Sequence, residues 1–408
     1  MSFVRKDADP NPIVDTVFAV AMRAKQDKAE NGDLVVDATI GSMFDEDGQF
    51  VAFHSVFDHY DSIDHRVKGA YASSFLGNPG YCRDVYSWVT QGADLSLAHS
   101  VIASPGGSGA IASAFTSFLD KGETIILPDI GWSSYELMAS QNNINTTHYE
   151  VFDGDRFNLD SVRQAVNESV DRQGRAVLVI NDPCHNPTGY SLTVSEWRSL
   201  VEILNEASRR GPVILIDDVA YIDYSFDLAH SRDYMNTFND FSDNVMAVIA
   251  FSCSKALTSY GLRCGAAVLL SKTQEAVREA EIVFEKTARA IWSNIPNAAM
   301  ENFSWVVSEN REAYLAEKQV CIDLLKQRSE LFVREAKECG LPLYPYREGF
   351  FITIKTDPAK TEAIHEALMN EHIYTVTMPG GIRVAVCSLP VRKTAGLASR
   401  MKQIIDKI

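Results

Sequence analysis

The middle of the chain alternates continuous apolar runs with amphipathic segments, and this alternation restricts the possible folds more than any other feature. The runs lack the alternating polar and apolar residues of half-exposed strands. They therefore predict strands that are buried on both faces of a mostly parallel sheet. The runs lie at residues 124–127, 176–180, 213–216, 245–251 and 266–270.

The segments between these runs are typical of helices. The clearest covers residues 195–210, with an apolar stripe that includes Trp197 and Leu204. Thr193 and Glu196 predict a capping box at its start. Strands and helices in this order indicate an α/β protein with an open sheet and helices on both faces. Such sheets bind ligands at the carboxyl ends of their strands, so functional residues are expected there.

The two ends of the chain have a different pattern. The N-terminal end holds an extended arm, a helical pattern and a short apolar segment, whereas the C-terminal end begins with a long helical pattern. Strand-like runs follow at 349–355 and 383–387, and a helical pattern covers 391–408. We expect both ends to form one smaller α+β domain. The predicted segments are 1–49 (arm and first part of the small domain), 50–309 (large domain) and 310–408 (second part of the small domain).

Composition excludes several classes of protein. The 408 residues carry 54 acidic and 38 basic side chains, a net charge of -16, which argues against nucleic acid or an anionic membrane as partner. No apolar stretch is long enough to span a bilayer, and the N-terminus does not resemble a signal peptide. Seven cysteines without C-x-x-C spacing argue against disulfides and against a metal site. These features predict a cytoplasmic protein.

A lysine follows one of the predicted strands, in the string Ser252-Cys253-Ser254-Lys255, and Arg263 comes shortly after it. Lysine is rarely buried without a partner. Burial lowers the pKa of a lysine, and a neutral amine can attack an aldehyde. Neighbouring hydroxyls and an arginine suit a phosphate group. A surface loop with an incidental lysine is the alternative interpretation.

Three further segments could bind a ligand: Asp217-Asp218-Val219-Ala220-Tyr221 and His185-Asn186-Pro187-Thr188-Gly189, which follow predicted strands, and Gly106-Gly107-Ser108-Gly109-Ala110. The first could hold the proton of a pyridinium ring, and the second leaves an asparagine amide free to donate. The glycines precede a helical pattern, where free amide groups can bind an anion. An acidic turn, an ordinary turn and a flexible loop are the respective alternatives. The glycine spacing matches neither a P-loop nor a dinucleotide fingerprint, which argues against a nucleotide-binding oxidoreductase.

In this order the four segments resemble the fold-type I pyridoxal-phosphate enzymes, and within them the class I aminotransferases. The resemblance covers nearly the whole chain. Three more segments are similar to the aspartate/aromatic subgroup: A-D-P-N-P-I at 8–13, I-G-S-M-F-D-E-D-G at 40–48 and R-A-I-W-S-N-I-P at 289–296. The resemblance implies a large domain with a mostly parallel seven-stranded sheet, a small α+β domain, and pyridoxal 5′-phosphate as cofactor.

The resemblance also implies catalytic roles. Lys255 would bind the cofactor covalently and then move a proton between the substrate Cα and C4′ of the cofactor. Asp218 would keep the pyridine nitrogen protonated, so that the ring acts as an electron sink. Asn186 and Tyr221 would bond the ring oxygen O3′.

Binding roles follow from the same resemblance. Arg383 would hold the α-carboxylate of the substrate in a two-pronged bond, and Gly41 would line the substrate site. Tyr71 would reach the phosphate of a second subunit, which implies a homodimer with shared active sites. The remaining cofactor-binding residues would be Gly107, Ser108, Ser252 and Arg263 at the phosphate, and Trp132 on the ring face.

The expected reaction moves an amino group between an L-amino acid and a 2-oxo acid. In the subgroup, an arginine expected shortly after the S-N-x-P segment binds a distal carboxylate of the substrate. Counting forward from Ser293 reaches Glu301, and no arginine occurs between Arg289 and Arg311. We therefore expect a neutral or aromatic donor. A cationic donor that faces Glu301 is a weaker alternative. A surface glutamate that binds no ligand is an equally supported interpretation of this position.

Two other functions share these motifs. A related fold-type I enzyme could eliminate or decarboxylate an amino acid with the same cofactor-binding residues. A ligand-binding or regulatory relative could keep the fold without the activity, but such proteins usually carry a DNA-binding extension, and none is visible here.

Overall fold

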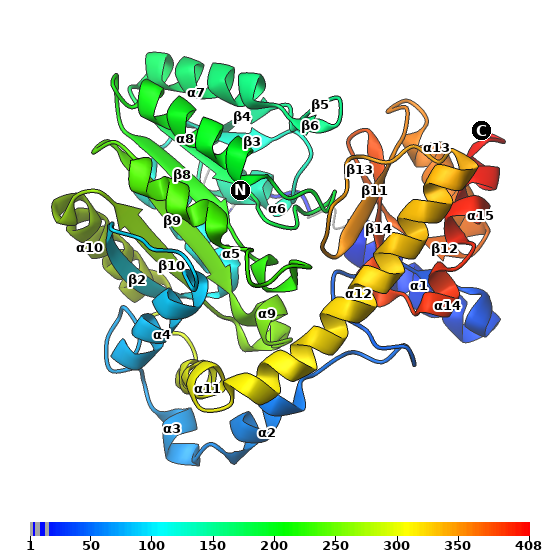
Figure 1. Cartoon of the computed structure of the whole chain (residues 1–408), viewed down its shortest axis with the longest axis horizontal. Helices are drawn as coiled ribbons and strands as arrows, with labels where there is room; N and C mark the ends of the chain where they lie inside the picture. Colours follow the sequence, from blue (N-terminus) through cyan, green and yellow to red (C-terminus); the bar gives the residue numbers. More distant parts are fainter. Residues whose placement is uncertain (1–2, 5–8, 13–15) are drawn as a thin grey trace.

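The computed structural model describes residues 3–4, 9–12 and 16–408. Its larger part is built on a seven-stranded sheet in the order β2-β10-β9-β8-β7-β3-β4 (Figure 1). β10 is antiparallel to its neighbours β2 and β9, whereas the other neighbouring pairs are parallel, so the predicted mostly parallel sheet is confirmed. The strands are β2 (Ala98–Pro105), β3 (Thr124–Pro128), β4 (Asn145–Tyr149), β7 (Ala176–Ile180), β8 (Val213–Asp218), β9 (Val245–Ser252) and β10 (Cys264–Ser271).

Helices cover both faces of this sheet because successive strand residues point to opposite sides. Ile125 and Val177 pack with helices of one face, and Ile126 and Leu178 pack with helices of the other. The first face is covered by α5 (Gly106–Phe118), α6 (Ser134–Gln141) and α10 (Gln274–Ile291). The second face is covered by α4 (Pro79–Val89), α7 (Leu159–Gln173), α8 (Val194–Ala207) and α11 (Asn297–Ser308).

Helix α8 forms where the apolar stripe predicts it. The Thr193 hydroxyl accepts a hydrogen bond from the Glu196 amide, and the Thr193 amide donates to the Glu196 carboxylate, so the predicted capping box is present. Trp197 and Leu204 are fully buried. The helix ends at Ala207, three residues before the predicted end.

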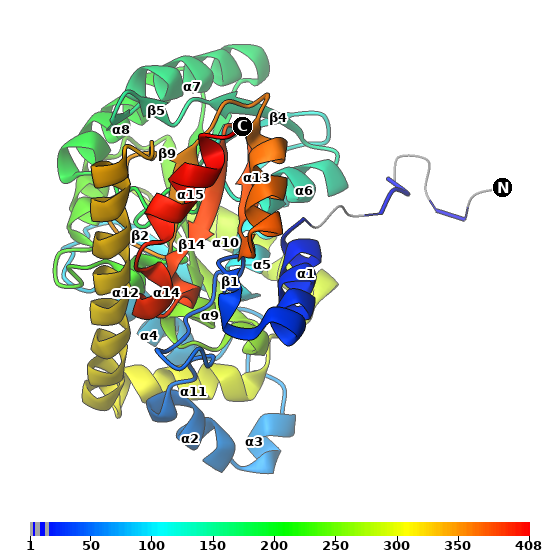
Figure 2. The same cartoon turned by 90° about the vertical axis from the view of Figure 1, so that its right-hand side faces the viewer.

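The small domain contains elements from both ends of the chain. β1 (Val36–Asp37) pairs in parallel with β12 (Ile373–Tyr374), and Figure 2 shows the blue α1 (Thr16–Asn31) next to the orange and red C-terminal elements. A second sheet has the order β11-β14-β13. The expected α+β domain is therefore present. Its other elements are β11 (Phe351–Lys355), β13 (Val376–Met378), β14 (Gly381–Ala385), α13 (Thr361–Asn370), α14 (Val391–Thr394) and α15 (Leu397–Ile405).

A long helix, α12 (Arg311–Cys339), runs from the large domain into the small domain (Figure 1). The predicted domain boundaries at 49/50 and 309/310 stay a prediction. The remaining short elements are α2 (His54–Ser62), α3 (His65–Gly69), α9 (Cys253–Ala256), β5 (Phe152–Asp153), β6 (Arg156–Phe157), and the 3-10 turns Gly32–Leu34, Ile222–Tyr224, Asp233–Asp240, Tyr260–Leu262 and Val386–Ser388.

The structure corrects the helical pattern predicted for 391–408. Two helices, α14 and α15, occupy it, because Gly396 adopts a left-handed φ of 77° between them. The arm at 8–13 is described only in part, since Ala8 and Ile13 lie outside the described residues.

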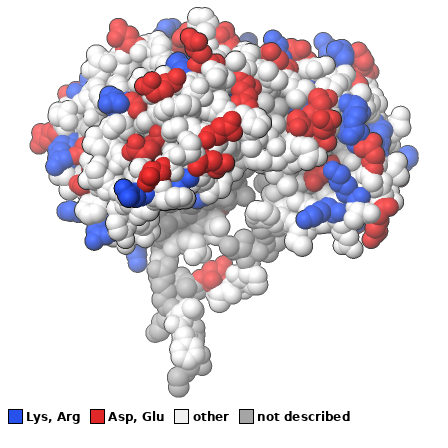
Figure 3. All heavy atoms as spheres, turned by 90° about the horizontal axis from the view of Figure 1, so that it is seen from below, with Lys and Arg blue, Asp and Glu red and all other residues white. Residues whose placement is uncertain are grey.

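Surface and composition add three observations. None of the helices in the described part of the chain combines the length and the apolar content that a bilayer span requires. Acidic and basic side chains are interspersed over the face seen in Figure 3. All seven cysteines are free thiols.

Candidate active site

The polar segments predicted from the sequence meet at one edge of the large sheet. β8 ends at Asp218, β9 ends at Ser252 just before Lys255, and β7 ends shortly before Asn186. These strands are parallel, so their carboxyl ends share that edge.

A cavity of about 190 Å³ lies there, and nine of the predicted cofactor residues line it. The nine are Gly107, Ser108, Trp132, Asn186, Asp218, Tyr221, Ser252, Lys255 and Arg263. The other lining residues are Ile111, Asn181, Ala220, Ser254 and Tyr260.

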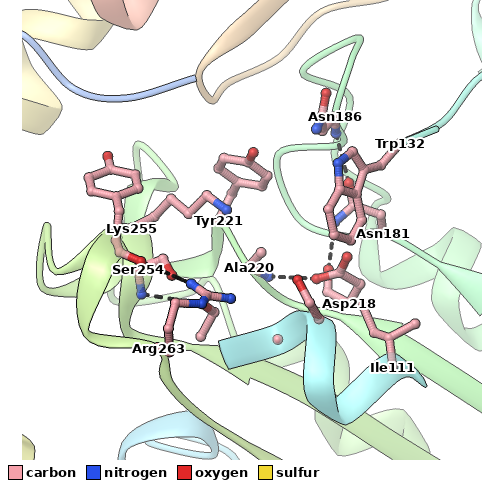
Figure 4. Close-up of a pocket in the computed structure, with 14 residues that line it drawn as sticks. Ile111, Trp132, Asn181, Asn186, Asp218, Ala220, Tyr221, Ser254, Lys255 and Arg263 are labelled. Atoms are coloured by element: carbon pink, nitrogen blue, oxygen red, sulfur yellow. Dashed lines mark hydrogen bonds between the residues drawn. The ribbon is translucent and has the colours of Figure 1, made fainter. Parts of the chain in front are cut away.

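Lys255 is the amine of this cavity. Its Nζ lies 5.0 Å from the centroid of the Tyr221 ring, and Figure 4 shows the two side chains directed toward one another. Desolvation by the surrounding protein lowers the pKa of Lys255, an effect that the Asp218 carboxylate opposes. The lysine is therefore easier to deprotonate than an exposed one, which suits a nucleophile or a base.

Asp218 supplies a buried carboxylate. Burial raises its pKa, whereas hydrogen bonds and the nearby lysine oppose that rise. The Tyr135 hydroxyl donates to Oδ2 at 2.6 Å, and the Ala220 amide donates to Oδ1 at 3.1 Å. Asn181 Nδ2 donates to the Asp218 carbonyl at 2.6 Å, which fixes the end of β8 (Figure 4). The carboxylate is thus held in place at the cavity wall.

The N-terminus of α5 and Arg263 lie together and could hold an anion. Gly106 has a φ of 71°, and a Cβ there would lie 2.5 Å from Nη2 of Arg263. Only glycine lets the guanidinium lie this close to the helix start. Arg263 also bonds the Ser254 hydroxyl at 3.3 Å and the carbonyl of Pro105 at 3.2 Å. The first amides of α5 have no partner within the helix, so together with Arg263 they favour a phosphate.

Arg383 lies next to the cavity and connects it to the small domain. Its Nη1 donates to Asn186 Oδ1 at 3.2 Å, and its Nη2 donates to the Thr39 carbonyl at 2.9 Å. Its guanidinium carbon lies 4.3 Å from the centroid of the Phe351 ring. Among the described residues none accepts a hydrogen bond from its buried Nε, so this arginine keeps a donor for a ligand.

Gly41 lies next to Phe351, the ring that Arg383 contacts, because a Cβ at Gly41 would lie 2.5 Å from Cζ of Phe351.

Two other predicted residues lie elsewhere. The Tyr71 side chain is 83% exposed and does not line the cavity of its own chain. Glu301 lines a separate cavity and accepts a hydrogen bond from Asn78 Nδ2 at 2.6 Å. Glu301 therefore does not line the cofactor cavity of its own chain.

Comparisons with known proteins agree with this geometry. The family described as "Aminotransferase class I and II" matches residues 73–401. A solved aminotransferase from Anaerococcus prevotii is 34% identical, with 99% of each chain covered and a TM-score of 0.96. The chain belongs to the class I and II aminotransferases.

Other aminotransferases are more distant. The aromatic-amino-acid aminotransferase of Pseudomonas aeruginosa is 26% identical over 53% of each chain, so the chain spans little more than half the length of that curated relative. A Burkholderia pseudomallei aromatic-amino-acid aminotransferase, solved with covalently bound pyridoxal phosphate, has a TM-score of 0.80 at 21% identity, with 99% of this chain and all of that chain covered. At that identity the likeness shows the fold.

Aminotransferases of this family use pyridoxal phosphate, and the cavity fits that cofactor. A covalent link needs a lysine, a pyridinium nitrogen needs a carboxylate, and a phosphate needs amides and cations. The cavity offers these groups in Lys255, Asp218 and the α5 N-terminus with Arg263.

The sequence did not reveal every residue of this aminotransferase pocket. Tyr135, Asn181 and Tyr260 line the cavity or bond its residues, but no role was predicted for them. Asn181 directly follows a predicted strand, and that position could have drawn attention to it. Tyr135 lies on α6 and looks like ordinary packing in the sequence.

His185, in the turn that also carries Asn186, is expected to make the free energy of unfolding depend on pH. Burial lowers the pKa of His185 to about 4 from its ordinary 6.5, and its Nδ1 lies 2.9 Å from the Thr188 hydroxyl. Because the unfolded chain binds this proton more readily, the stabilisation is present above the ordinary pKa and is lost as pH falls toward 4. We expect His185 to account for a loss of about 2 kcal/mol between about pH 7 and pH 5.

Urea unfolding of the wild type and of His185→Gln at both pH values measures this contribution. The variant is expected to lose less stability on acidification. His54→Gln is the matched control, because the His54 side chain is 88% exposed. Equal losses in the wild type and His185→Gln would contradict the prediction.

Proposed function

We propose that this protein is a pyridoxal-phosphate-dependent aminotransferase that moves an amino group between an L-amino acid and a 2-oxo acid. The observation that supports it best is the placement of three groups. The Lys255 amine and the Asp218 carboxylate line one cavity. Asn186 also lines it and accepts a hydrogen bond from Arg383.

Each of these groups has a proposed role. Bound pyridoxal phosphate supplies an electron sink for the bonds at the amino acid Cα. Lys255 would hold the cofactor. It would then take the proton from the substrate Cα and deliver it to C4′ of the cofactor. Asp218 keeps the proton on the pyridine nitrogen, and Tyr135 orients its carboxylate. Arg383 binds the α-carboxylate with its guanidinium fork.

The cofactor's other contacts follow from the cavity wall. Asn186 and Tyr221 are proposed to donate to the ring oxygen O3′, and Trp132 to cover the ring face. The phosphate is proposed to bind the Gly107 amide, Ser108, Ser252 and Arg263.

We further propose a homodimer in which Tyr71 reaches the phosphate site of the second subunit. The exposure of Tyr71 and its absence from the cavity of its own chain support this arrangement. The mass of the particle in light scattering tests it. The free cysteines favour a cytoplasmic location.

The donor is proposed to be neutral or aromatic, as the sequence suggested. One observation favours a dicarboxylic donor as the second candidate. Arg289 is stacked 4.9 Å from the centroid of the Phe75 ring, and Phe75 belongs to the same segment as Tyr71. If Tyr71 enters the site of a second subunit, Arg289 accompanies it and could bind a distal carboxylate.

Absorbance titration of the cofactor-loaded protein with phenylalanine and with aspartate tests both candidates. We expect conversion to the amino form of the cofactor, with one oxo acid formed per site, and kcat/KM about tenfold or more higher for phenylalanine. A preference for aspartate that Arg289→Ala removes would establish the second candidate. Ammonia or carbon dioxide release instead would indicate a lyase or a decarboxylase. No spectral change with any amino acid would indicate a binding relative.

A further inference from the structure

Helix α12 carries two cations that are fully buried. Lys318 and Arg328 each have 0% exposure, and neither lines the cofactor cavity. They lie ten positions apart, which corresponds to about 15 Å along a helix. Long charged side chains are almost never fully buried without partners, so each of these two cations is expected to have specific partners.

Lys318 holds the short helix that carries the cofactor lysine. Its Nζ donates to the carbonyl of Ala256, the last residue of α9 and the neighbour of Lys255. The Tyr314 hydroxyl donates to the same carbonyl at 2.7 Å. A carbonyl at a helix end has no partner within the helix, so these two donors fix the end of α9.

The surroundings of Lys318 keep water away from this contact. Its Nζ lies 4.5 Å from the ring centroid of Tyr224, 5.1 Å from that of Tyr314 and 5.5 Å from that of Phe53. Asp223 offsets its charge, and Asp223 is itself paired with Arg232 and bonded by Trp88 Nε1 at 3.0 Å. Lys318 thus makes its hydrogen bond to α9 without exposure to solvent in the folded chain.

Arg328 holds the segments around the substrate end of the site. Its Nη1 donates to the carbonyl of Cys387 at 2.9 Å, four residues after Arg383. Its Nη2 and Nε donate to Glu46 Oε1 at 2.7 and 3.2 Å, in the segment 40–48 that contains Gly41. The Phe44 amide also donates to the Cys387 carbonyl at 3.1 Å, which joins the two segments.

We propose that Lys318 and Arg328 are positioning residues that set the spacing between Lys255 and Arg383 through one rigid helix. This inference rests on the proposed function. A substrate bound by its α-carboxylate must present its Cα to the lysine, and small misplacements slow such reactions strongly. Because α12 spans both domains, it holds the lysine from its N-terminal half and the arginine segment from its C-terminal half.

Two methionine variants separate the two contacts. Lys318→Met is expected to slow covalent capture of pyridoxal phosphate by the cofactor-free protein, and to lower kcat, each about tenfold. Its dissociation constant for a 2-methyl amino acid, which has no Cα proton to lose, should stay near that of the wild type. Arg328→Met is expected to raise that dissociation constant, and KM, about tenfold, with the capture rate unchanged.

Lys326→Met is the matched control, because Lys326 lies on the same helix with a half-exposed side chain. Tyr314→Phe and Arg328→Lys replace the methionine variants if these do not fold, and smaller shifts in the same directions are expected. A general loss of packing would change capture and affinity together in both variants. That result, or an effect of Lys326→Met of similar size, would overturn this inference alone. A wild-type protein that captures no cofactor would overturn the proposed function and this inference with it.

Discussion

Lys255→Ala is expected to abolish covalent binding of pyridoxal phosphate and to lower the transamination rate by at least about 10⁴-fold. One positioned proton-transferring group contributes about 10²–10⁴-fold to a rate, and Lys255 also provides the covalent link. No other amine lines the cavity among the described residues, so no neighbour can replace it. Borohydride reduction followed by peptide mass spectrometry locates the bound cofactor, and steady-state assays give the rate.

The control for this experiment is Lys326→Ala, which removes a half-exposed lysine of α12. It should keep both the label and the activity. A small alkylamine added to Lys255→Ala should restore part of the rate, because it can enter the space of the missing side chain and move the proton. A label found on a different lysine of the wild type, or normal turnover by Lys255→Ala, would contradict the assignment.

Asp218→Asn is expected to lower kcat by about 10²–10³-fold. The substitution keeps the shape of the side chain and removes its charge, so the pyridinium nitrogen loses its buried partner. Leaving a buried charge without its partner costs about 3–5 kcal/mol, and each 1.4 kcal/mol is about tenfold in rate. Single-turnover measurements with a saturating amino donor report this step directly.

The same change should not destabilise the cofactor-free protein. Burial raises the pKa of Asp218, so its ionisation disfavours the folded state as pH rises above the pKa of the unfolded chain. Asp218→Asn should therefore unfold at the same or a higher urea concentration near pH 7. Asp217→Asn is the matched control, since Asp217 is buried next to it but bonds Tyr234 at 2.7 Å and does not line the cavity. Unchanged turnover in Asp218→Asn, or an equal loss in Asp217→Asn, would contradict the proposed role.

Strand prediction succeeded in the middle of the sheet and failed at its edges. The five predicted strands are β3, β7, β8, β9 and β10, which all have neighbours on both sides. The two strands that were not predicted, β2 and β4, are the edge strands. β4 has the sequence N-T-T-H-Y and is half-exposed, so it lacks the continuous apolar run that marks a buried strand.

The site shows the same division between local and distant contacts. Lys255, Asp218 and Asn186 were found because each lies at or shortly after the end of a strand, and parallel strands end at one edge. The contact of Tyr135 with Asp218 joins residues 83 positions apart, and that of Arg383 with Asn186 joins residues 197 apart. No pattern along the chain specifies such pairs.

The sequence by itself determined the fold class, the small domain built from both ends, and the set of groups expected to hold the cofactor. Hydrophobic period and short-range spacing carry that information, because they depend on residues a few positions apart. Only the tertiary structure decided where Glu301 lies, which hydroxyl holds Asp218, and that α12 bonds the segments around Lys255 and Arg383. These contacts depend on the direction of side chains around packed helices and on how two domains meet, and neither is encoded in local spacing.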